Sequence, residues 1–172
     1  MTIAASDFRT CVIKPALSAL EAVGIPHTEV AENLLMVTAA VESNLGTYLV
    51  QRGGPALGVF QLEPTSMVNL LSKVTLAQRG VINKFKSPQS FSAQLPTNLL
   101  LAAVLCRLFY WQIPTPLPEP IFGTFSVDPE TGVITNTGYW GYYKRWYNTV
   151  LGAATEGMFA TAVDLYTDII LS

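Results

Sequence analysis

The sequence predicts a mainly helical α+β fold, in which a small β-hairpin and loop region lies beside a helical core. Apolar residues recur at helical spacing along most of the 172 residues, whereas only the segment 122–135 has the pattern of a hairpin. Half of the residues are hydrophobic and 13% are charged. This length suits one domain with a sizeable core and is too short for two ordinary ones, so we expect a single domain over 1–172.

The first half of the chain predicts two helices followed by a glycine-rich loop. The expected elements are an N-terminal helix over 7–23 that stops at Gly24, a helix over 29–43 that is capped by Thr28, and a short strand over 48–50. Pro15 lies inside the first helix and predicts a kink or break at Lys14. Residues 45–58 contain four glycines and a proline, which is typical of a loop or small hairpin.

The second half predicts more helices, interrupted by a proline-rich loop and the hairpin. The expected elements are a helix opened by Pro64, a helix over 76–85, a helix from 96–98 to about 111, an extended loop over 114–120, strands at 124–127 and 132–135, an aromatic helix over 139–148 capped by Asn136 or Thr137, and a last helix from Thr155 to near Ile170. The helix that ends near Trp111 is apolar nearly all round, which predicts a central buried helix. The aromatic residues after 138 favour core packing, and a platform for sugar rings is the alternative.

Charge and hydropathy exclude several classes of partner. The net charge is −2, the pI is near 5.3 and no basic tract is present, so we expect no nucleic-acid partner. The longest apolar run, Leu99 to Cys106, is too short for stable insertion in a membrane. The N-terminus lacks the charged and apolar regions of a signal peptide. A role outside the cytoplasm would therefore need another route of delivery.

Cysteine and histidine usage leaves little room for metal or triad chemistry. Cys11 and Cys106 both lie in apolar helical patterns and are expected to be small buried hydrophobes rather than a disulfide. The single histidine, His27, follows a turn signal and is expected to be a solvated loop residue. Zinc hydrolase sites usually need two or three histidines or a cysteine cluster. We therefore expect no metal and no cofactor.

Glu42 is the candidate general acid. It lies at the end of the helix over 29–43, on the same face as Thr38 and Ala39. Partial burial and the negative end of the helix dipole both raise the pKa of such a carboxyl, as an acid catalyst near neutral pH requires. The alternative interpretation is a surface glutamate at a helix end. Gly58 follows in the glycine-rich segment, where glycine would allow the backbone to approach a ligand.

Three short motifs together resemble a known family. They are Glu42-Ser43, Gly58-Val59-Phe60-Gln61 and Trp146-Tyr147-Asn148, with Leu95-Pro96-Thr97-Asn98-Leu99 before the last. Their order and spacing resemble the goose-type-lysozyme-like lytic transglycosylases (the SLT family), bacteriophage members above all, over residues 28–150. The resemblance implies a lysozyme-like fold. Val59 and Phe60 replace leucine and methionine of the family, and Trp146 replaces alanine. Residues 114–135 look like an insertion, either a substrate-side flap or a docking surface.

The resemblance implies cleavage of the β-1,4 bond between N-acetylmuramic acid and N-acetylglucosamine in peptidoglycan glycan strands. Glu42 would protonate the leaving oxygen and then act as a base. Tyr147 would orient Glu42, and Asn148 would bind an acetamido or backbone group. Ser43 and Gln61 would position the glutamate or the muramyl sugar. The predicted substrate-binding residues are Ser43, Tyr48, Gly58, Gln61, Tyr147 and Asn148.

The number of nearby carboxyls bears on the product. Between Glu42 and Ser66 the only other acidic residue is Glu63, which we expect to cap the helix at Pro64. A lone acid favours a lytic transglycosylase, in which the 6-hydroxyl of the substrate attacks and a 1,6-anhydro sugar forms, because hydrolytic glycosidases generally use a second carboxylate. A hydrolytic lysozyme assisted by Glu63 and an inactive virion protein that binds peptidoglycan remain alternatives.

The resemblance to bacteriophage proteins also suggests where the protein acts. An endolysin in the infected cell and a subunit of the virion, in contact with tail or capsid proteins, are both compatible with it. In either case the site of action would be the bacterial periplasm and cell wall.

Overall fold

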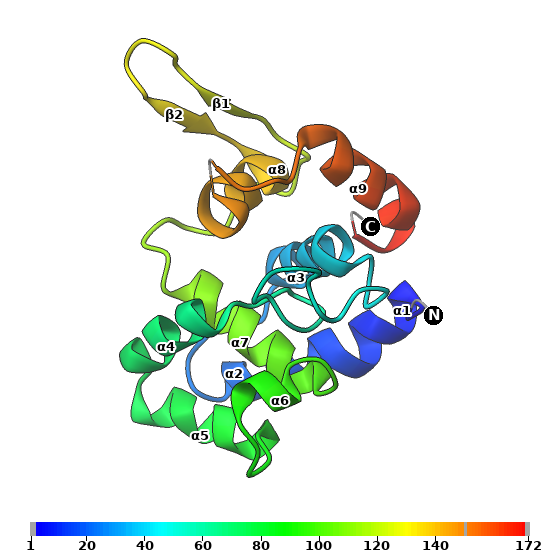
Figure 1. Ribbon diagram of the computed structural model, residues 1–172, viewed down its shortest axis with the longest axis vertical. Coiled ribbons are helices and arrows are strands. Elements are labelled where there is room, and N and C mark those ends of the chain that lie inside the picture. Colours follow the sequence, from blue (N-terminus) through cyan, green and yellow to red (C-terminus); the bar gives the residue numbers. More distant parts are fainter. Residues whose placement is uncertain (1–2, 150, 171–172) are drawn as a thin grey trace.

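The computed structural model describes residues 3–149 and 151–170, the last four as backbone only, and is built mainly of helices (Figure 1). In chain order the elements are α1 (Ala5–Phe8), η1 (Arg9–Ile13), α2 (Lys14–Glu21), α3 (Glu29–Ser43), α4 (Pro64–Lys73), α5 (Leu76–Phe85), α6 (Phe91–Gln94), α7 (Leu99–Trp111), β1 (Phe125–Val127), β2 (Ile134–Asn136), α8 (Gly138–Tyr143), η2 (Lys144–Asn148) and α9 (Glu156–Ile170). The two segments labelled η are π-helical. The predicted mainly helical class with a small hairpin is confirmed.

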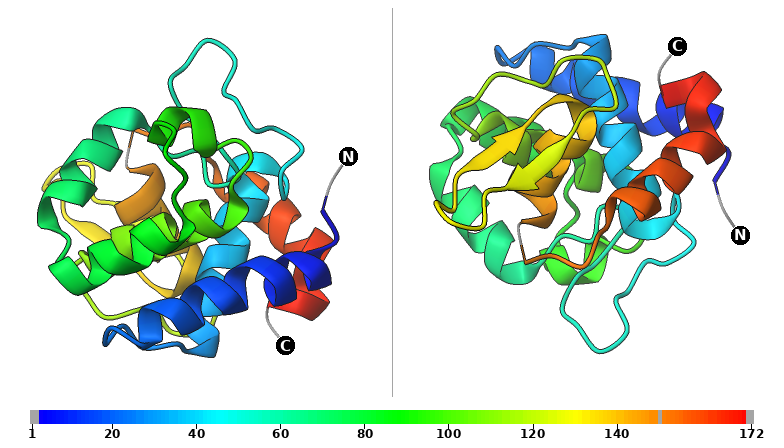
Figure 2. Two further views of the ribbon diagram at one scale, coloured as in Figure 1. Left: turned by 90° about the horizontal axis from the view of Figure 1, so that it is seen from below. Right: turned by 90° about the horizontal axis from the view of Figure 1, so that it is seen from above.

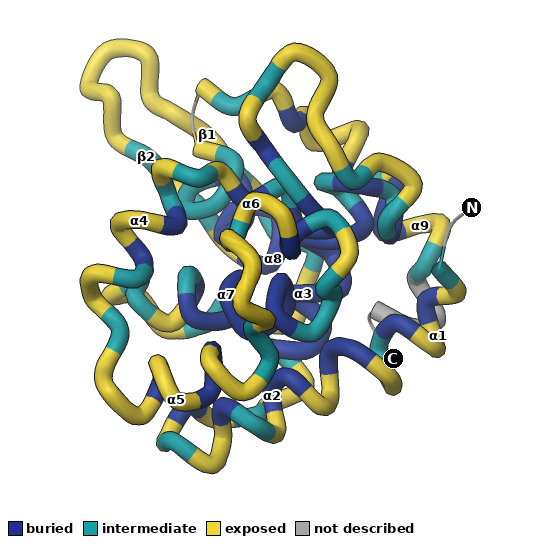
Figure 3. The backbone as a smooth tube through the Cα atoms, turned by 60° about the horizontal axis from the view of Figure 1, so that its bottom comes forward, coloured by how far each residue is buried: buried dark blue, intermediate teal, exposed yellow. Residues whose placement is uncertain are grey.

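Two helices, α3 and α7, form the centre of the molecule. Figure 3 shows both as largely buried, with exposed backbone around them. Every residue of α7 from Leu101 to Leu108 is buried, which confirms the predicted central helix. It packs against α2, α3 and α5, and α3 also packs against α9. The core therefore surrounds the helix that carries Glu42.

Helix α3 begins and ends where the sequence predicts. The Thr28 hydroxyl accepts a hydrogen bond from the backbone N–H of Ala31 at 3.2 Å, as an N-cap does. The helix ends because Asn44 adopts the left-handed conformation, with φ of 49°, and Leu45 follows with φ of 48°. The chain therefore turns sharply away directly after Glu42 and Ser43.

The N-terminal helix differs from its prediction in how it accommodates proline. The chain stays helical from Ala5 to Glu21 and does not break at Lys14. Instead, the segment Arg9–Ile13 widens to a π-helix immediately before α2. Pro15 then lies in the first turn of α2, where its missing N–H leaves no bond unmade. Gly24, with φ of +85°, ends the helical stretch as expected.

The loop between α3 and α4 projects from the body of the molecule (Figure 2). The strand predicted over 48–50 is absent. Only isolated bridges form there, between Val50 and Leu57 and between Leu57 and Leu62. The glycines and Pro55 favour turns over a continuous ladder, so the prediction of a loop was the better of the two.

The hairpin and the helices that flank it mostly follow their predictions. Strands β1 and β2 pair antiparallel with Phe125 opposite Asn136, and the hairpin extends away from the helical body (Figure 1). Helices α4, α5 and α7 form as predicted, whereas the short α6 was not anticipated. The aromatic helix begins at Gly138 after Thr137 and changes to a π-helix at Lys144. Its residues Tyr139 to Tyr143 are buried, as the core interpretation required.

Two polar predictions for the N-terminal region are wrong. Cys11 is exposed instead of buried, whereas Cys106 in α7 is buried as predicted, and both are free. His27 is not simply solvated, because its Nε2 lies 2.7 Å from Oε1 of Glu32. The other oxygen of Glu32 lies 3.1 Å from Nη1 of Arg9. Glu32 therefore ties the N-terminal helices and the following turn to α3. Within the residues that the structure describes, no helix is both long and apolar enough to cross a membrane.

Candidate active site

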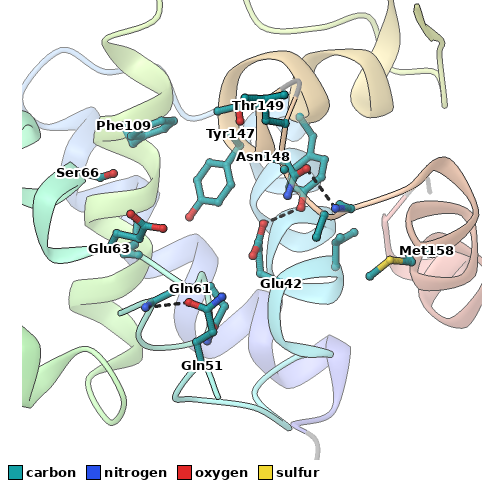
Figure 4. Close-up of a pocket in the computed structure, with 18 residues that line it drawn as sticks. Glu42, Gln51, Gln61, Glu63, Ser66, Phe109, Tyr147, Asn148, Thr149 and Met158 are labelled. Atoms are coloured by element: carbon teal, nitrogen blue, oxygen red, sulfur yellow. Dashed lines mark hydrogen bonds between the residues drawn. The ribbon is translucent and has the colours of Figure 1, made fainter. Parts of the chain in front are cut away.

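A pocket of about 590 Å³ opens where the end of α3 meets η2 and the start of α4 (Figure 4). This size falls within the range of small-molecule sites. Its lining consists of Val41, Glu42, Gln51, Ala56, Gln61, Leu62, Glu63, Ser66, Phe109, Tyr143, Tyr147, Asn148, Thr149, Leu151, Gly152, Ala153, Ala154 and Met158. The pocket thus brings together residues from the three motifs that are far apart in the sequence.

Glu42 lies in this pocket with one hydrogen-bond partner. The phenol of Tyr143 donates to its Oε1 at 2.6 Å, and no described residue bonds to Oε2. Burial raises the pKa of Glu42 from 4.5 to about 7, although the Tyr143 bond opposes the shift. No described lysine, arginine or histidine forms an ion pair with it. The predicted rise in pKa is confirmed, and its main cause is burial.

An aromatic stack forms the wall behind Glu42. Tyr147 lies between Tyr110 and Tyr143, with ring centroids 5.3 Å and 6.0 Å away and interplanar angles of 28° and 21°. The Tyr147 hydroxyl donates to the backbone carbonyl of Phe60 at 2.6 Å. The prediction that Tyr147 orients Glu42 is therefore wrong in detail. Tyr143, one helical turn earlier, makes that bond, while Tyr147 ties η2 to the Gly58–Gln61 segment.

Ser43 and Gln61 join the end of α3 to the facing segment. Ser43 is buried, and its hydroxyl donates to the backbone carbonyl of Val59 at 2.7 Å and accepts from the N–H of Gly46 at 2.9 Å. Gln61 lines the pocket, and its Nε2 donates to the carbonyl of Gly58 at 2.8 Å. Ser43 therefore does not line the pocket itself. It fixes the end of α3, and with it the position of the adjacent Glu42.

Tyr48 and Gly58, like Ser43, are predicted substrate-binding residues that do not line the pocket. Tyr48 is 64% exposed on the projecting loop, and only its backbone carbonyl reaches Gln61, at 3.3 Å from Nε2. Gly58 is buried with φ of +77°, and a Cβ at this position would collide with the backbone carbonyl of Leu95. Its missing side chain thus permits close packing against the chain before α7, rather than against a ligand.

Asn148 lines the pocket, but its side-chain oxygen is already used inside the protein. Asn148 Oδ1 accepts from Nζ of Lys144 at 2.8 Å and from the N–H of Ala154 at 3.2 Å. Its side chain also interacts with the Tyr143 phenol and lowers the pKa of that phenol, against the larger rise caused by burial. Asn148 therefore organises the pocket wall through its oxygen, rather than presenting that oxygen to a ligand as predicted.

Glu63 is a second carboxyl of the pocket. It occupies the N-cap position of α4, yet its side chain accepts no capping hydrogen bond, so the predicted capping role is wrong. The contact made by its carboxylate is with the Thr65 hydroxyl, at 3.4 Å. Figure 4 shows Glu42 and Glu63 on different walls, one from α3 and one from the start of α4.

Unusual backbone conformations gather around the pocket. Four described residues other than glycine have positive φ, and three of them, Asn44, Gln61 and Thr149, line the pocket or lie two residues from Glu42. The segment η2, which carries Tyr147 and Asn148, is π-helical. Such conformations have an energetic cost and recur at functional sites.

Sequence reasoning missed Tyr143 and Lys144. Tyr143 precedes Tyr147 by four residues in the aromatic helix, and this spacing could have indicated that both face one side. Lys144 gave no such signal, because two of its three acceptors are backbone carbonyls brought near it by the fold. Among the residues described, no cluster of three or more histidine, cysteine, aspartate or glutamate side chains could hold a metal ion.

The arrangement defines a class of site in which one partly buried carboxyl with a raised pKa opens onto a pocket with an aromatic wall. No family model, curated protein or solved structure matches the chain. The function is therefore argued from this geometry and from the motifs.

Proposed function

We propose that the protein is a lysozyme-like enzyme that cleaves the β-1,4 bond between N-acetylmuramic acid and N-acetylglucosamine, most simply as a lytic transglycosylase with Glu42 as its acid. The observation that carries the proposal is the state of Glu42. With a pKa of about 7 in a ligand-sized pocket, this carboxyl holds a proton at neutral pH that it can transfer. The bacteriophage setting rests on the motif resemblance alone.

In this proposal the two carboxyl oxygens of Glu42 have different roles. Tyr143 donates to Oε1, which leaves Oε2 as the oxygen that can carry the acidic proton toward a ligand. Glu42 would give this proton to the glycosidic oxygen as the bond to the anomeric carbon breaks. The resulting carboxylate would then take the proton of the attacking 6-hydroxyl, which closes the 1,6-anhydro ring and restores the acid.

Hydrolysis is the second candidate, and the position of Glu63 favours it. Because its carboxylate lines the pocket without a capping bond, Glu63 is available as a base for an attacking water. Inverting glycosidases place an acid and a base on opposite sides of the scissile bond with room for that water. The same Glu42 acid would then yield a reducing sugar instead of an anhydro sugar.

Digestion of purified murein sacculi, followed by mass spectrometry of the products, tests the proposal. Anhydromuropeptides would support the transglycosylase, and reducing-end muropeptides would support the lysozyme. In the lysozyme case, Glu63→Gln should abolish hydrolysis while Ser66→Ala, also in the pocket wall, leaves it. The absence of any products from well-folded protein would contradict both and leave a peptidoglycan-binding or virion role. Glu42→Gln must be inactive in the first two cases.

A further inference from the structure

Lys144 is a buried cation without an acidic partner. Lys144 is only 7% exposed, and none of the ion pairs among the described residues includes it. Burial lowers its pKa, which reflects the cost of placing an ammonium there. A lysine in such a place needs hydrogen-bond acceptors for all three of its N–H donors.

Three oxygen atoms satisfy the ammonium, one from the end of η2 and two from the loop that follows it. Nζ of Lys144 lies 2.8 Å from Asn148 Oδ1, 2.7 Å from the carbonyl oxygen of Gly152 and 2.9 Å from that of Ala154. This loop supplies one wall of the pocket. A single ammonium group therefore hydrogen-bonds to three residues of the pocket wall.

The same contacts lead toward the acid. Asn148 accepts from Lys144, and it lines the same pocket as Glu42 and Tyr143. Tyr143 directly precedes Lys144 in the chain and donates to Glu42 at 2.6 Å. A displacement of Lys144 would therefore reach Glu42 through the adjacent Tyr143.

We propose that Lys144 is a positioning residue of this site: it holds Asn148, Gly152 and Ala154 of the pocket wall in place and fixes the adjacent Tyr143, which bonds to Glu42. Its effect on glycan cleavage rests on the proposed function, whereas its effect on Glu42 does not. A lysine with a purely structural role would stabilise the fold and leave the properties of Glu42 unchanged.

Two variants disturb this arrangement in different ways. Lys144→Met removes the three donors and the charge. Gly152→Ala keeps the lysine, but the added Cβ would collide with the backbone and side-chain oxygens of Asn148 and push the loop away. Gly80→Ala is the matched control, because a Cβ at Gly80 meets nothing within 4 Å. Lys73→Met, on the exposed side of α4, controls for the loss of a lysine.

The first readout needs no substrate. The titration of the Glu42 carboxyl is followed by carbon-13 NMR in the wild type and the four variants. We expect Lys144→Met and Gly152→Ala to move the midpoint upward, because a loosened Tyr143 bond no longer favours the charged carboxylate, and the two controls to leave it in place. The groups that face Glu42 electrostatically are Tyr110, Tyr143, Tyr147 and Cys106, none of which is changed.

The second readout is cleavage of sacculi. We expect kcat/KM to fall roughly 10- to 100-fold in Lys144→Met and Gly152→Ala, since small misplacements of catalytic groups have effects of this size. An unchanged Glu42 midpoint in a folded Gly152→Ala protein would overturn the proposal, and so would wild-type kcat/KM in either variant. If the wild type cleaves no glycan, the proposed function fails, and the NMR titration alone decides the role of Lys144.

Discussion

Helix α3 carries two partly or fully buried glutamates, Glu32 and Glu42, ten residues apart. Glu32 lies in the first turn, and both of its oxygens are engaged, one by Arg9 at 3.1 Å and the other by His27 at 2.7 Å. Glu42 lies in the last turn with a single phenol as its partner. The same residue type in the same helix thus meets two opposite environments.

This difference distinguishes a carboxylate with a structural role, Glu32, from a candidate catalytic carboxyl, Glu42. Near the start of a helix, the backbone dipole and a cation both favour the charged form, whereas the end of the helix favours the neutral acid. Glu32 fastens the N-terminal helices onto α3 and has no free oxygen. Glu42 keeps one oxygen free and opens onto a pocket.

The largest expected effect is on activity. Glu42→Gln removes the acidic proton and should lower the rate of sacculus cleavage about a thousandfold, within the range of general acid catalysis. Glu32→Gln is the matched control, because it makes the same change on the same helix. The rate per folded molecule of this control should stay within about twofold of wild type. Equal losses in both variants would show that the two glutamates do not differ as described.

The next largest effect is on stability, where Glu32→Gln rather than Glu42→Gln should show the loss. Glu32→Gln leaves the partly buried guanidinium of Arg9 without its charged partner and should lower the free energy of unfolding by about 3 kcal/mol at pH 7. Glu42→Gln should not destabilise the fold at this pH. Urea unfolding of the two variants and the wild type measures both. A marginal loss in Glu32→Gln would mean that the ion pair contributes little.

A smaller effect depends on pH. Because the pKa of Glu42 is raised to about 7 in the folded protein, the folded state keeps a proton that the unfolded state loses above about 4.5. Stability conferred by Glu42 therefore falls as the pH rises from 4.5 through 7. Glu42→Gln should be more stable than wild type by up to about 3 kcal/mol at pH 8, and equally stable at pH 4. Thermal or urea unfolding at both pH values measures the difference, and a constant difference would refute the linkage.

The smallest effect distinguishes the two stacked tyrosines. Tyr143→Phe deletes the bond to Glu42 and should lower kcat about tenfold, the equivalent of one hydrogen bond to a charged group. It should also shift the alkaline limb of the pH–rate profile upward, because the bond lowers the pKa of Glu42. Tyr147→Phe should leave that limb in place, since its hydroxyl bonds to the Phe60 carbonyl instead. Identical profiles for both variants would contradict these assignments.

Local sequence signals predicted most of the helical frame. Thr28, Pro64 and the apolar run before Trp111 indicated where helices begin, because caps, first-turn prolines and hydrophobic periodicity act over a few residues. The pattern also placed Glu42 at the end of α3. The strand at 48–50 failed because a short apolar stretch between glycines does not determine whether it pairs.

The contacts of the site were harder to predict, because they join segments distant in the chain. Tyr143 and Glu42 are 101 residues apart, and Tyr147 and Phe60 are 87 residues apart. The motif placed Tyr147 in the pocket but could not show which tyrosine bonds to the acid. The role of Gly58 was missed for the same reason. Its close neighbour is the backbone carbonyl of Leu95, which only the folded chain brings near.

A site-specific carbon-13 NMR titration of the Glu42 carboxyl tests the central claim most directly. Partly buried beside a single phenol, this carboxyl should titrate with a midpoint near pH 7, and its assignment is checked by the loss of the signal in Glu42→Gln. A midpoint near the ordinary value of 4.5 would contradict the account, because Glu42 would then be a carboxylate without a proton to give at neutral pH.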